Sequence, residues 1–575
     1  MQMVSPEPEA TTAAWPNEPP GIDFDTALIS AAMGIMLPSL PLRETAKLGK
    51  KLLANPGVLA DPLQKLAVKI GKIATGALPD DPAAGDRRYS DPAWAHPVFR
   101  AIAQAHRAIG ATVEDVVDAG LDDATDLYRV HLASTNLTAA LSPANWPWSN
   151  PAALQLTVAT QGRNLLLGGK RFVSDILDPP RIPARSEPAR FILGVDLAAT
   201  PGAVVLRTPT VELLQYSPTT PDVVAEPLLM IPSLINKYYL MDLSPQRSMV
   251  EYAVGSGVQV FHVSWINPDE RERDFGLDAY VEGIVAAIDA VKAITGRDRI
   301  HVLGACAGGQ LTAIALAHLA GLGRHGEIAT YTLPVCVMDH GNKASLSGLL
   351  TEEVTTKALG RVDKIGYVDG RVLGGALHYM RPVDGIWTAW VERYLLAKTI
   401  PRVDVFHWSE DTTNLPAALT RDLLTLTLGN RLVTPRAQEV LGDPIDLTSL
   451  TAPGYLLAGT RDFLTEWRSC YATSRMVSSE IRFALVEAGH LQAILQIPNG
   501  KPVGFRAGQA TSDDPDQWRA ATAHRDGSWW GDWRDWLEQH SAGSRPAPTN
   551  LGSANYPPLG TAPGQYVRRR FDSRR

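Results

Sequence analysis

The pattern of apolar and polar positions changes character near residue 190. Before that point, leucines and isoleucines recur at helical spacing, as in residues 48–53 and 63–73, with lysines on the other faces. After it, short apolar runs alternate with helical patterns. This change predicts a mainly helical N-terminal domain over residues 23–188 and a strand–helix domain over residues 189–575. Residues 1–22 are rich in Pro and Ala without any periodicity, so we expect a disordered tail there.

Several runs in the second domain have the composition of buried strands, and they are residues 203–206, 211–216, 228–231, 258–265, 300–303, 333–338, 454–458 and 481–486. A helix with a regular apolar stripe is expected from Asp278 onward. Alternation of this kind predicts a mostly parallel sheet with helices on both faces. An aromatic-rich stretch at about 340–447 interrupts it and predicts a helical cap. Trp529, Trp533 and Trp536 share one face of a short helix, which is typical of a core or an interface.

Residues 299–317, RIHVLGACAGGQLTAIALA, predict a strand, a sharp turn and a helix in immediate succession. Gly304, Cys306 and Gly308 have the G-x-S-x-G spacing of a nucleophile elbow, with cysteine in the place of serine. Small residues flank the nucleophile because the turn is tight. The chemistry indicated is attack by the Cys306 sulfur on an acyl group, and a thioester enzyme intermediate suits acyl transfer from another thioester.

A cysteine nucleophile needs a base and an orienting carboxylate, which follow the elbow in the order acid, then histidine. Asp462 follows the strand that ends at Ala458, and His490 follows the strand that ends at Val486, which is expected to be the last strand of the sheet. We therefore expect His490 to take the thiol proton and Asp462 to hold the imidazole in the correct tautomer. Asp339, after the predicted strand 333–338, remains an alternative orienting residue.

The oxyanion formed during acyl transfer needs backbone N–H donors. One is expected from Ala307, directly after the nucleophile and at the start of a helix. The second is expected from the loop after strand 228–231, from Leu234 or Ile235.

Charge, cysteine content and hydropathy indicate which partners and which compartment to expect. The net charge is −7 and the only basic cluster is at the C-terminal end, so nucleic acid is not an expected partner. The three cysteines, Cys306, Cys336 and Cys470, fit a reducing compartment, and Cys336 and Cys470 are expected to be buried small hydrophobes. The uncharged stretch 26–42 is short for a transmembrane span and lacks a basic leader. We therefore expect a cytoplasmic protein with no transmembrane segment.

Motifs in order along the chain resemble those of the polyhydroxyalkanoate (PHA) synthases, which polymerise 3-hydroxyacyl-CoA. The matching segments are DRRY at 86–89, DPAW at 91–94, TPGAVV at 200–205, LQY at 214–216, INKYY at 235–239, VSW at 263–265, LGACAGG at 303–309, NLP at 414–416 and GH at 489–490. GAC, DLSP at 242–245 and APGQYV at 562–567 look most like the medium-chain, class II branch.

The resemblance implies an α/β-hydrolase fold with a helical cap and a helical N-terminal domain. It assigns Cys306 as the acyl-bearing nucleophile, His490 as the base for the thiol and for the monomer hydroxyl, and Asp462 as the carboxylate. It also implies a 3-hydroxyacyl-CoA substrate, a growing polyester chain, a homodimer and a location at the granule surface. No metal and no organic cofactor is implied.

The sequence departs from the family pattern in places. Phe463 stands where the family commonly has His after the catalytic Asp, Glu466 stands where it has Pro, and Ser233 replaces a second proline after Pro232. Two other functions therefore stay open: a cysteine thioesterase or esterase of the same fold, and an inactive granule-associated scaffold.

Overall fold

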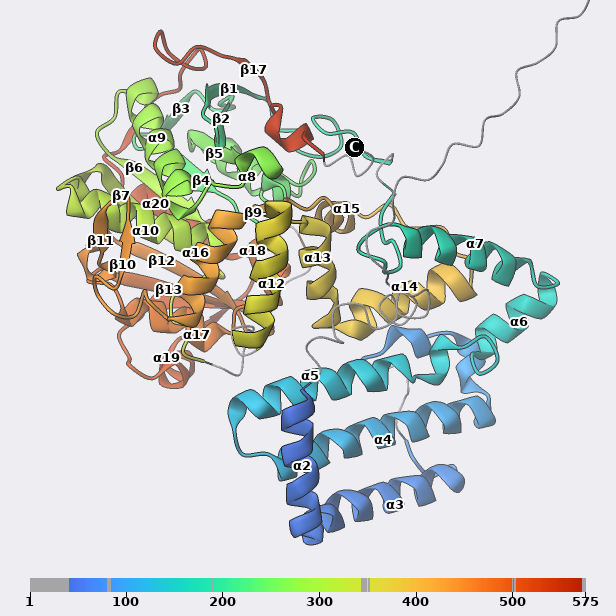
Figure 1. Cartoon of the computed structure of the whole chain (residues 1–575). Coiled ribbons are helices and arrows are strands. Elements are labelled where there is room, and N and C mark those ends of the chain that lie inside the picture. The colour runs from blue at the N-terminus through green and yellow to red at the C-terminus, as the bar shows by residue number, and fades with distance from the viewer. Residues whose placement is uncertain are drawn as a thin grey trace, which may run out of the picture.

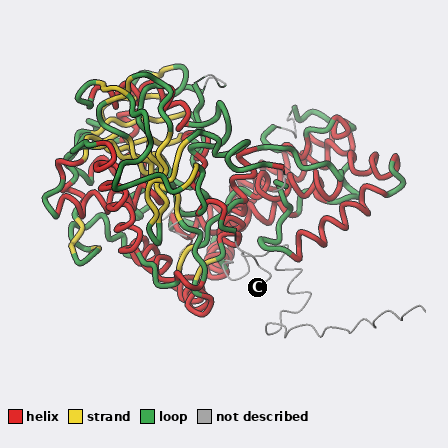
Figure 2. Tube along the Cα trace, turned by 90° about the horizontal axis from the view of Figure 1, so that it is seen from above, coloured by secondary structure: helices red, strands yellow, loops and turns green. Residues whose placement is uncertain are grey.

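The computed structural model describes residues 41–570 apart from 80–83, 188–189, 343–348, 350–351, 499 and 501–502. The predicted tail over residues 1–22 lies outside these residues. Figure 1 shows a body built on one large sheet and, to one side of it, a group of helices. Seen from above, in Figure 2, the strands gather in one half of the molecule and the other half is helical. None of the described helices is long and apolar enough to cross a membrane.

The helical group consists of α2 (Leu42–Ala54), α3 (Ala60–Ala74), α4 (Pro97–Gly120), α5 (Ala124–Ala140), α6 (Pro151–Ala159) and α7 (Arg163–Leu177). Local signals start these helices: Pro97 occupies the first turn of α4, and the Asp123 carboxylate caps α5 by accepting from two backbone N–H groups. Helix α7 joins the group to the rest of the molecule. A Cβ on Gly168 would lie 1.8 Å from the carbonyl oxygen of Tyr394, so only glycine allows this approach.

The central sheet has eleven strands in the order β15-β14-β13-β12-β7-β6-β4-β5-β2-β1-β17. Their bounds are β1 Gly202–Arg207, β2 Val211–Tyr216, β4 Leu228–Ile231, β5 Val260–Trp265, β6 Ile300–Gly304, β7 Ile328–Pro334, β12 Gly454–Gly459, β13 Ile481–Val486, β14 Phe505–Gln509, β15 His524–Arg525 and β17 Gly560–Thr561. Across β1-β2-β5-β4-β6-β7-β12-β13, only β2 runs against its neighbours. This is the α/β-hydrolase arrangement, and the predicted fold class is confirmed.

Helices cover both faces of the sheet, because successive residues of each buried strand point to opposite sides. Helices α9 (Leu277–Thr295) and α10 (Ala307–Gly321) pack on one face, and α8 (Met249–Gly255) and α20 (Trp529–Gln539) pack on the other. Trp529, Trp530 and Trp533 are at most 1% exposed. Of the two roles predicted for the tryptophan stripe, the core is the one observed.

Two strand predictions are wrong. The strand expected at 333–338 is β7, which begins earlier and ends at Pro334; Val335 has φ 47°, so the chain leaves the sheet there. Cys336 therefore lies beyond the strand and not inside it. The strand before His490 is also not the last, because β14 pairs antiparallel with β13 and β15 extends the sheet further.

The segment between β7 and β12 is mainly helical. It contains α12 (Glu352–Ile365), α13 (Gly370–Tyr379), α14 (Thr388–Trp390) between two π-helical turns, α15 (Asp404–Glu410), α16 (Ala417–Leu428), the short pair β8 (Tyr367–Val368) and β9 (Leu415–Pro416), and the hairpin β10 (Gln438–Val440) and β11 (Asp443–Ile445). Leu419 and Leu426 of α16 and Val440 and Ile445 of the hairpin belong to the core under α9 and α10. In Figure 1, α13 and α14 lie between the sheet body and the N-terminal helices. The boundaries of the domains stay a prediction.

Candidate active site

The elbow forms where β6 ends and α10 begins. Cys306 has φ 52° and ψ −124°, a strained backbone conformation for a residue with a Cβ, and its N–H donates to the Pro334 carbonyl oxygen at 2.9 Å. Cys306 is partly exposed, whereas Cys336 and Cys470 are buried. This is the geometry that brings a nucleophile to the top of a sheet.

The glycines of the motif are required by close contacts. A Cβ on Gly304 would lie 2.2 Å from Thr312 Oγ1, and a Cβ on Gly308 would lie 2.2 Å from the Pro232 carbonyl oxygen. Pro232 precedes the loop with Leu234 and Ile235, which is named the oxyanion loop because it is expected to supply the second donor. The second contact therefore places the start of this loop directly against the first turn of α10. Ala307 is the first residue of that helix, and the first N–H groups of a helix have no intrahelical acceptor.

The loop that carries Leu234 and Ile235 is held from two sides. Trp265 Nε1 donates to the Pro232 carbonyl oxygen at 3.0 Å, and the Thr413 N–H donates to the Ile235 carbonyl oxygen at 2.9 Å. The Asn236 side-chain amide donates to the main-chain carbonyl oxygens of Trp408 and Ser409, within α15. The loop is therefore fixed between β5 and the cap segment.

His490 and Asp462 come together because β12 and β13 are parallel neighbours in register, with Gly459 opposite Val486. A Cβ on Gly459 would lie 2.6 Å from the Ala488 carbonyl oxygen, so the two turns touch. His490 Nδ1 lies 2.7 Å from Asp462 Oδ2. The other ring nitrogen is then left for the thiol, and Cys306 is among the groups that raise the pKa of His490.

Thr465, which the sequence reasoning missed, completes the carboxylate environment. Its hydroxyl donates to Asp462 Oδ2 at 2.6 Å and lies 3.2 Å from His490 Nδ1. Asp462 Oδ1 accepts from the N–H groups of Leu464 and Thr465. An Asp followed by Thr three residues on is the local pattern of a side-chain-capped turn and was the available signal.

The electrostatics of the pair favour a charged imidazolium. Burial lowers the pKa of His490, but the charge and hydrogen bond of Asp462, with the hydrogen bond to Cys306, outweigh it and raise the pKa to about 10. Burial raises the pKa of Asp462, but the charge of His490 and the hydrogen bonds that Asp462 accepts lower it overall. The ring can therefore hold the thiol proton.

The other candidates have different partners: Asp339 pairs elsewhere, and the Cys470 sulfur lies 3.7 Å from the Thr465 carbonyl oxygen. Asp339 Oδ1 accepts from Asn430 Nδ2 at 2.8 Å and from the Gly341 N–H at 2.7 Å, so the structure pairs it away from His490. Cys336 and Cys470 are buried, and burial raises the pKa of both thiols. Buried thiols of this kind are poor nucleophiles.

Phe463, which departs from the family pattern, lies between the carboxylate and the cap. Phe463 is 38% exposed, and the Arg381 guanidinium carbon lies 5.6 Å from its ring centroid. The position thus forms a cation–π contact with the cap.

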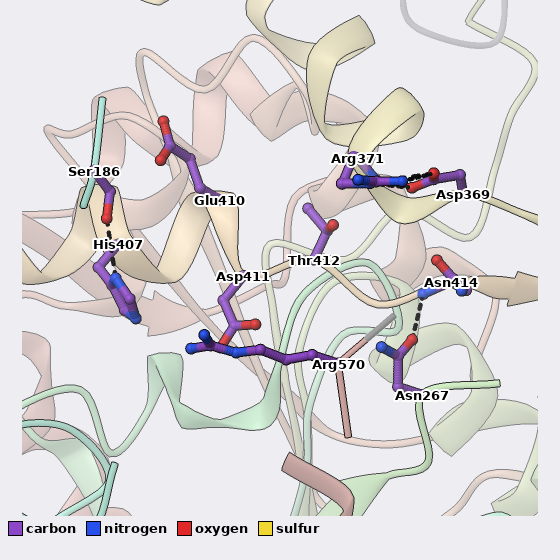
Figure 3. Close-up of a pocket in the computed structure, with 10 residues that line it drawn as sticks. All are labelled: Ser186, Asn267, Asp369, Arg371, His407, Glu410, Asp411, Thr412, Asn414 and Arg570. Atoms are coloured by element: carbon purple, nitrogen blue, oxygen red, sulfur yellow. Dashed lines mark hydrogen bonds and ion pairs between the residues drawn. The ribbon is translucent and has the colours of Figure 1, made fainter. Parts of the chain in front are cut away.

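A polar cavity of about 170 Å³ lies beside the cap segment that holds the oxyanion loop (Figure 3). It is lined by Ser186, Asn267, Asp369, Arg371, His407, Glu410, Asp411, Thr412, Asn414 and Arg570. Cys306, Asp462 and His490 are not among its walls. Within the described residues, no group of three or more His, Cys, Asp or Glu side chains is placed to hold a metal ion.

Comparison with known proteins identifies the family. Residues 85–253 match the family model described as "Poly-beta-hydroxybutyrate polymerase (PhaC) N-terminus". Poly(3-hydroxyalkanoate) polymerase 1 of Ectopseudomonas oleovorans is 36% identical over 491 residues, which cover 85% of this chain and 87% of that protein. The chain belongs to the poly(3-hydroxyalkanoate) polymerase family. A further member, the polymerase subunit PhaC of Cupriavidus necator, is 34% identical across 84% of this chain and 83% of its own length.

Solved structures resemble this chain only distantly. A hydrolase from Pseudomonas aeruginosa PA01 has 16% sequence identity and a TM-score of 0.32, covering 51% of this chain and 92% of that chain. The fold assignment therefore depends on the strand order given above.

Proposed function

We propose that this member of the family polymerises (R)-3-hydroxyacyl-CoA into polyester through an acyl thioester on Cys306. The observation that carries the proposal is a cysteine at a strained elbow together with an imidazole that is bonded to a buried carboxylate and whose pKa that cysteine helps to raise. Family membership supplies the substrate class, since the relatives are named poly(3-hydroxyalkanoate) polymerases.

In the loading step, His490 takes the Cys306 proton and the thiolate attacks the thioester carbonyl of the substrate. The oxyanion accepts hydrogen bonds from the Ala307 N–H and from Leu234 or Ile235. When the intermediate collapses, the carbon–sulfur bond to CoA breaks and the CoA sulfur leaves with the proton held by His490. Cys306 then carries the acyl group.

In the elongation step, His490 removes the proton of the hydroxyl group of a second acyl unit, and that oxygen attacks the Cys306 thioester. An ester bond forms, the bond to the Cys306 sulfur breaks, and the thiol recovers the proton from His490. Asp462 keeps the ring oriented and compensates its charge in both steps. An oxygen ester is more stable than a thioester, so this transfer runs downhill.

The test is to incubate the purified protein with a 3-hydroxyacyl-CoA and to follow both released CoA and insoluble polymer. Cys306→Ala should reduce CoA release by on the order of four decades or more. Gly321→Ala, at the far end of α10, is the control, because a Cβ added there meets no atom within 4 Å. Full turnover in Cys306→Ala would refute the mechanism.

The same assay separates the alternatives. Released CoA with only soluble hydroxy acid would identify a thioesterase. No CoA release from the unaltered protein would identify a scaffold.

We further propose that the protein works at the surface of its polyester product. Large apolar side chains are exposed along the N-terminal helices, including Val98, Ile102, Ile109 and Val113 on one face of α4. Exposed apolar patches of this kind are typical of contact with a hydrophobic surface.

A homodimer is a second proposal, based on the family resemblance. Light scattering should then give twice the chain mass of 62.1 kDa.

A further inference from the structure

The segment that ends the described chain is anchored firmly on the sheet. Strand β17 pairs with β1, and the buried carboxylate of Glu212 accepts from the N–H groups of Gln565 and Tyr566, each at 2.8 Å. The Tyr566 hydroxyl donates to the Thr208 carbonyl oxygen at 2.6 Å. The residues that follow are therefore held at a defined place against the sheet.

Arg569 continues this anchor with its side chain. Its guanidinium lies 2.6 Å from Asp269 Oδ2 and 3.1 Å from Glu272 Oε2, and these two carboxylates cap the turn after β5. Ion pairs of arginine with two carboxylates fix the arginine in orientation as well as in position. With the side chain held in this way, the main-chain carbonyl group of Arg569 points toward Lys237 and Asn267.

That carbonyl oxygen accepts two hydrogen bonds from the neighbourhood of the oxyanion loop. Lys237 Nζ and Asn267 Nδ2 each donate to it at 3.0 Å. Lys237 is 3% exposed and follows Ile235 by two residues. A buried ammonium is costly unless acceptors compensate it, so the carbonyl contributes to keeping Lys237 in place.

Asn267 extends the connection to the cap. Its side-chain oxygen accepts from the Asn414 N–H at 2.9 Å, next to Thr413, whose N–H donates to Ile235. Figure 3 shows Asn267 and Asn414 joined in this way, with Arg570 beside them. The Lys237 carbonyl oxygen in turn accepts from Trp408 Nε1 at 2.8 Å. The Arg569 carbonyl oxygen thus links Lys237, which follows the oxyanion loop, to Asn267, which is bonded to the cap segment beside that loop.

We propose that Arg569 is a positioning residue of the acyl-transfer site: anchored on Asp269 and Glu272, its carbonyl fixes Lys237 and Asn267 and thereby the loop that supplies the second oxyanion donor. This inference rests on the proposed function. It assigns a role in the reaction to a residue that lies 263 positions after the nucleophile in sequence. Arg569 acts through Lys237 and Asn267 and touches no reacting atom.

The test compares two reactions of Cys306 in the full-length protein. Acylation by a 3-hydroxyacyl-CoA, followed as CoA release in a single turnover, forms an oxyanion. Alkylation by iodoacetamide attacks a saturated carbon and forms none. Displacing an oxyanion donor by about 1 Å costs on the order of 100-fold, so Arg569→Ala and Lys237→Met should slow acylation at least about tenfold and leave alkylation within about twofold.

Arg271→Ala is the matched control, because it removes another arginine from Asp269 but leaves the pair with Arg569. It should keep acylation near the original rate, and Arg569→Lys should recover part of it. Unchanged acylation in Arg569→Ala, or equal loss of acylation and alkylation, would overturn the inference. If the unaltered protein forms no acyl-cysteine at all, the proposed function fails and this inference fails with it.

Discussion

At the scale of single residues, the carboxylate of Asp462 is the most fully satisfied group of the site. It accepts from His490, from the Thr465 hydroxyl and from two backbone N–H groups. A carboxylate with this many donors stays ionised and keeps its orientation, which is what an orienting residue requires. In the proposed mechanism, Thr465 thus acts on His490 through the carboxylate.

We expect Thr465→Val to lower kcat for CoA release by roughly tenfold with little change in KM, since the valine keeps the shape but removes one hydrogen bond of about 1–2 kcal/mol. Thr448→Val is the control, because the Thr448 hydroxyl donates in the same way to Asp446 on the surface. Steady-state kinetics of both variants measures the difference. Equal kinetics in the two would contradict the role given to Thr465.

The raised pKa of His490 also predicts how stability changes with pH. A group whose pKa is higher in the folded state stabilises the fold fully below its unfolded pKa, near 6.5, and loses this contribution as pH rises toward the folded value of about 10. The stability difference between the original protein and Asp462→Asn should therefore shrink between pH 6.5 and 10. Urea unfolding at several pH values measures it, and a constant difference would contradict the pairing.

Phe463 offers a test of the contact between the site and the cap. If the Arg381 guanidinium is held by the ring, a double-mutant cycle of Phe463→Leu and Arg381→Met should show a coupling of about 0.5–1 kcal/mol in the free energy of unfolding. Leucine keeps the apolar surface and removes the aromatic face. Additive effects of the two substitutions would show that the contact contributes nothing.

The residues of the candidate site differ in how far the sequence could predict them. Cys306, Asp462 and His490 follow strand ends, and strand ends of a parallel sheet meet at one edge, so their proximity could be expected. Thr465 needed only local reasoning. Lys237 and Arg569 could not be paired in advance, because their contact depends on where β17 docks and no periodic pattern encodes that.

At the scale of elements, the tight packing of α10 against the oxyanion loop makes Gly308 a sensitive position. The Cβ of Gly308→Ala would lie 2.2 Å from the Pro232 carbonyl oxygen, so helix and loop would have to separate. We expect a loss of acyl transfer of on the order of 100-fold with the fold retained, because the proposed oxyanion donors on the two elements move apart. CoA release and circular dichroism measure the two effects.

Gly321→Ala is the control for this substitution. Gly321 ends the same helix and has no atom within 4 Å of an added Cβ. Its replacement should leave activity unchanged and should not destabilise the helix. Comparable losses in both glycine variants would contradict the packing argument.

The elements themselves were predictable where the apolar runs are uniform. Strands β4 and β13 have the expected bounds, as both are buried on two faces and flanked by turn residues. The position of β7 was predicted wrongly, because its threonines and tyrosine are buried although their side chains carry polar groups. The apolar run after Pro334 matched the strand pattern better than β7 itself did. The antiparallel strands β14 and β15 were missed because they are short and partly exposed.

At the scale of the whole molecule, the two halves differ in what they expose. The sheet body buries most of its large apolar residues, whereas the N-terminal helices leave many exposed. The α4 face with Val98, Ile102, Ile109 and Val113 is between 37% and 58% exposed at these positions. A surface of this kind suits a polyester particle, which offers extensive apolar contact without specific partners. The active site and this face would then serve catalysis and attachment separately.

Ile102→Asn with Ile109→Asn should therefore weaken attachment to the polymer and spare catalysis. Burying one isoleucine contributes about 1.5–3 kcal/mol, so the pair should reduce binding to polyester particles at least about tenfold. Co-sedimentation with particles measures binding, and single-turnover CoA release should stay unchanged because α4 contributes no group to the acyl-transfer steps. Leu322→Asn with Leu559→Asn, two exposed leucines of the sheet body, is the control. If both double variants bind the particles equally well, attachment does not use α4. If the α4 variant binds the particles normally but no longer dimerises, this face of α4 joins two copies of the chain instead.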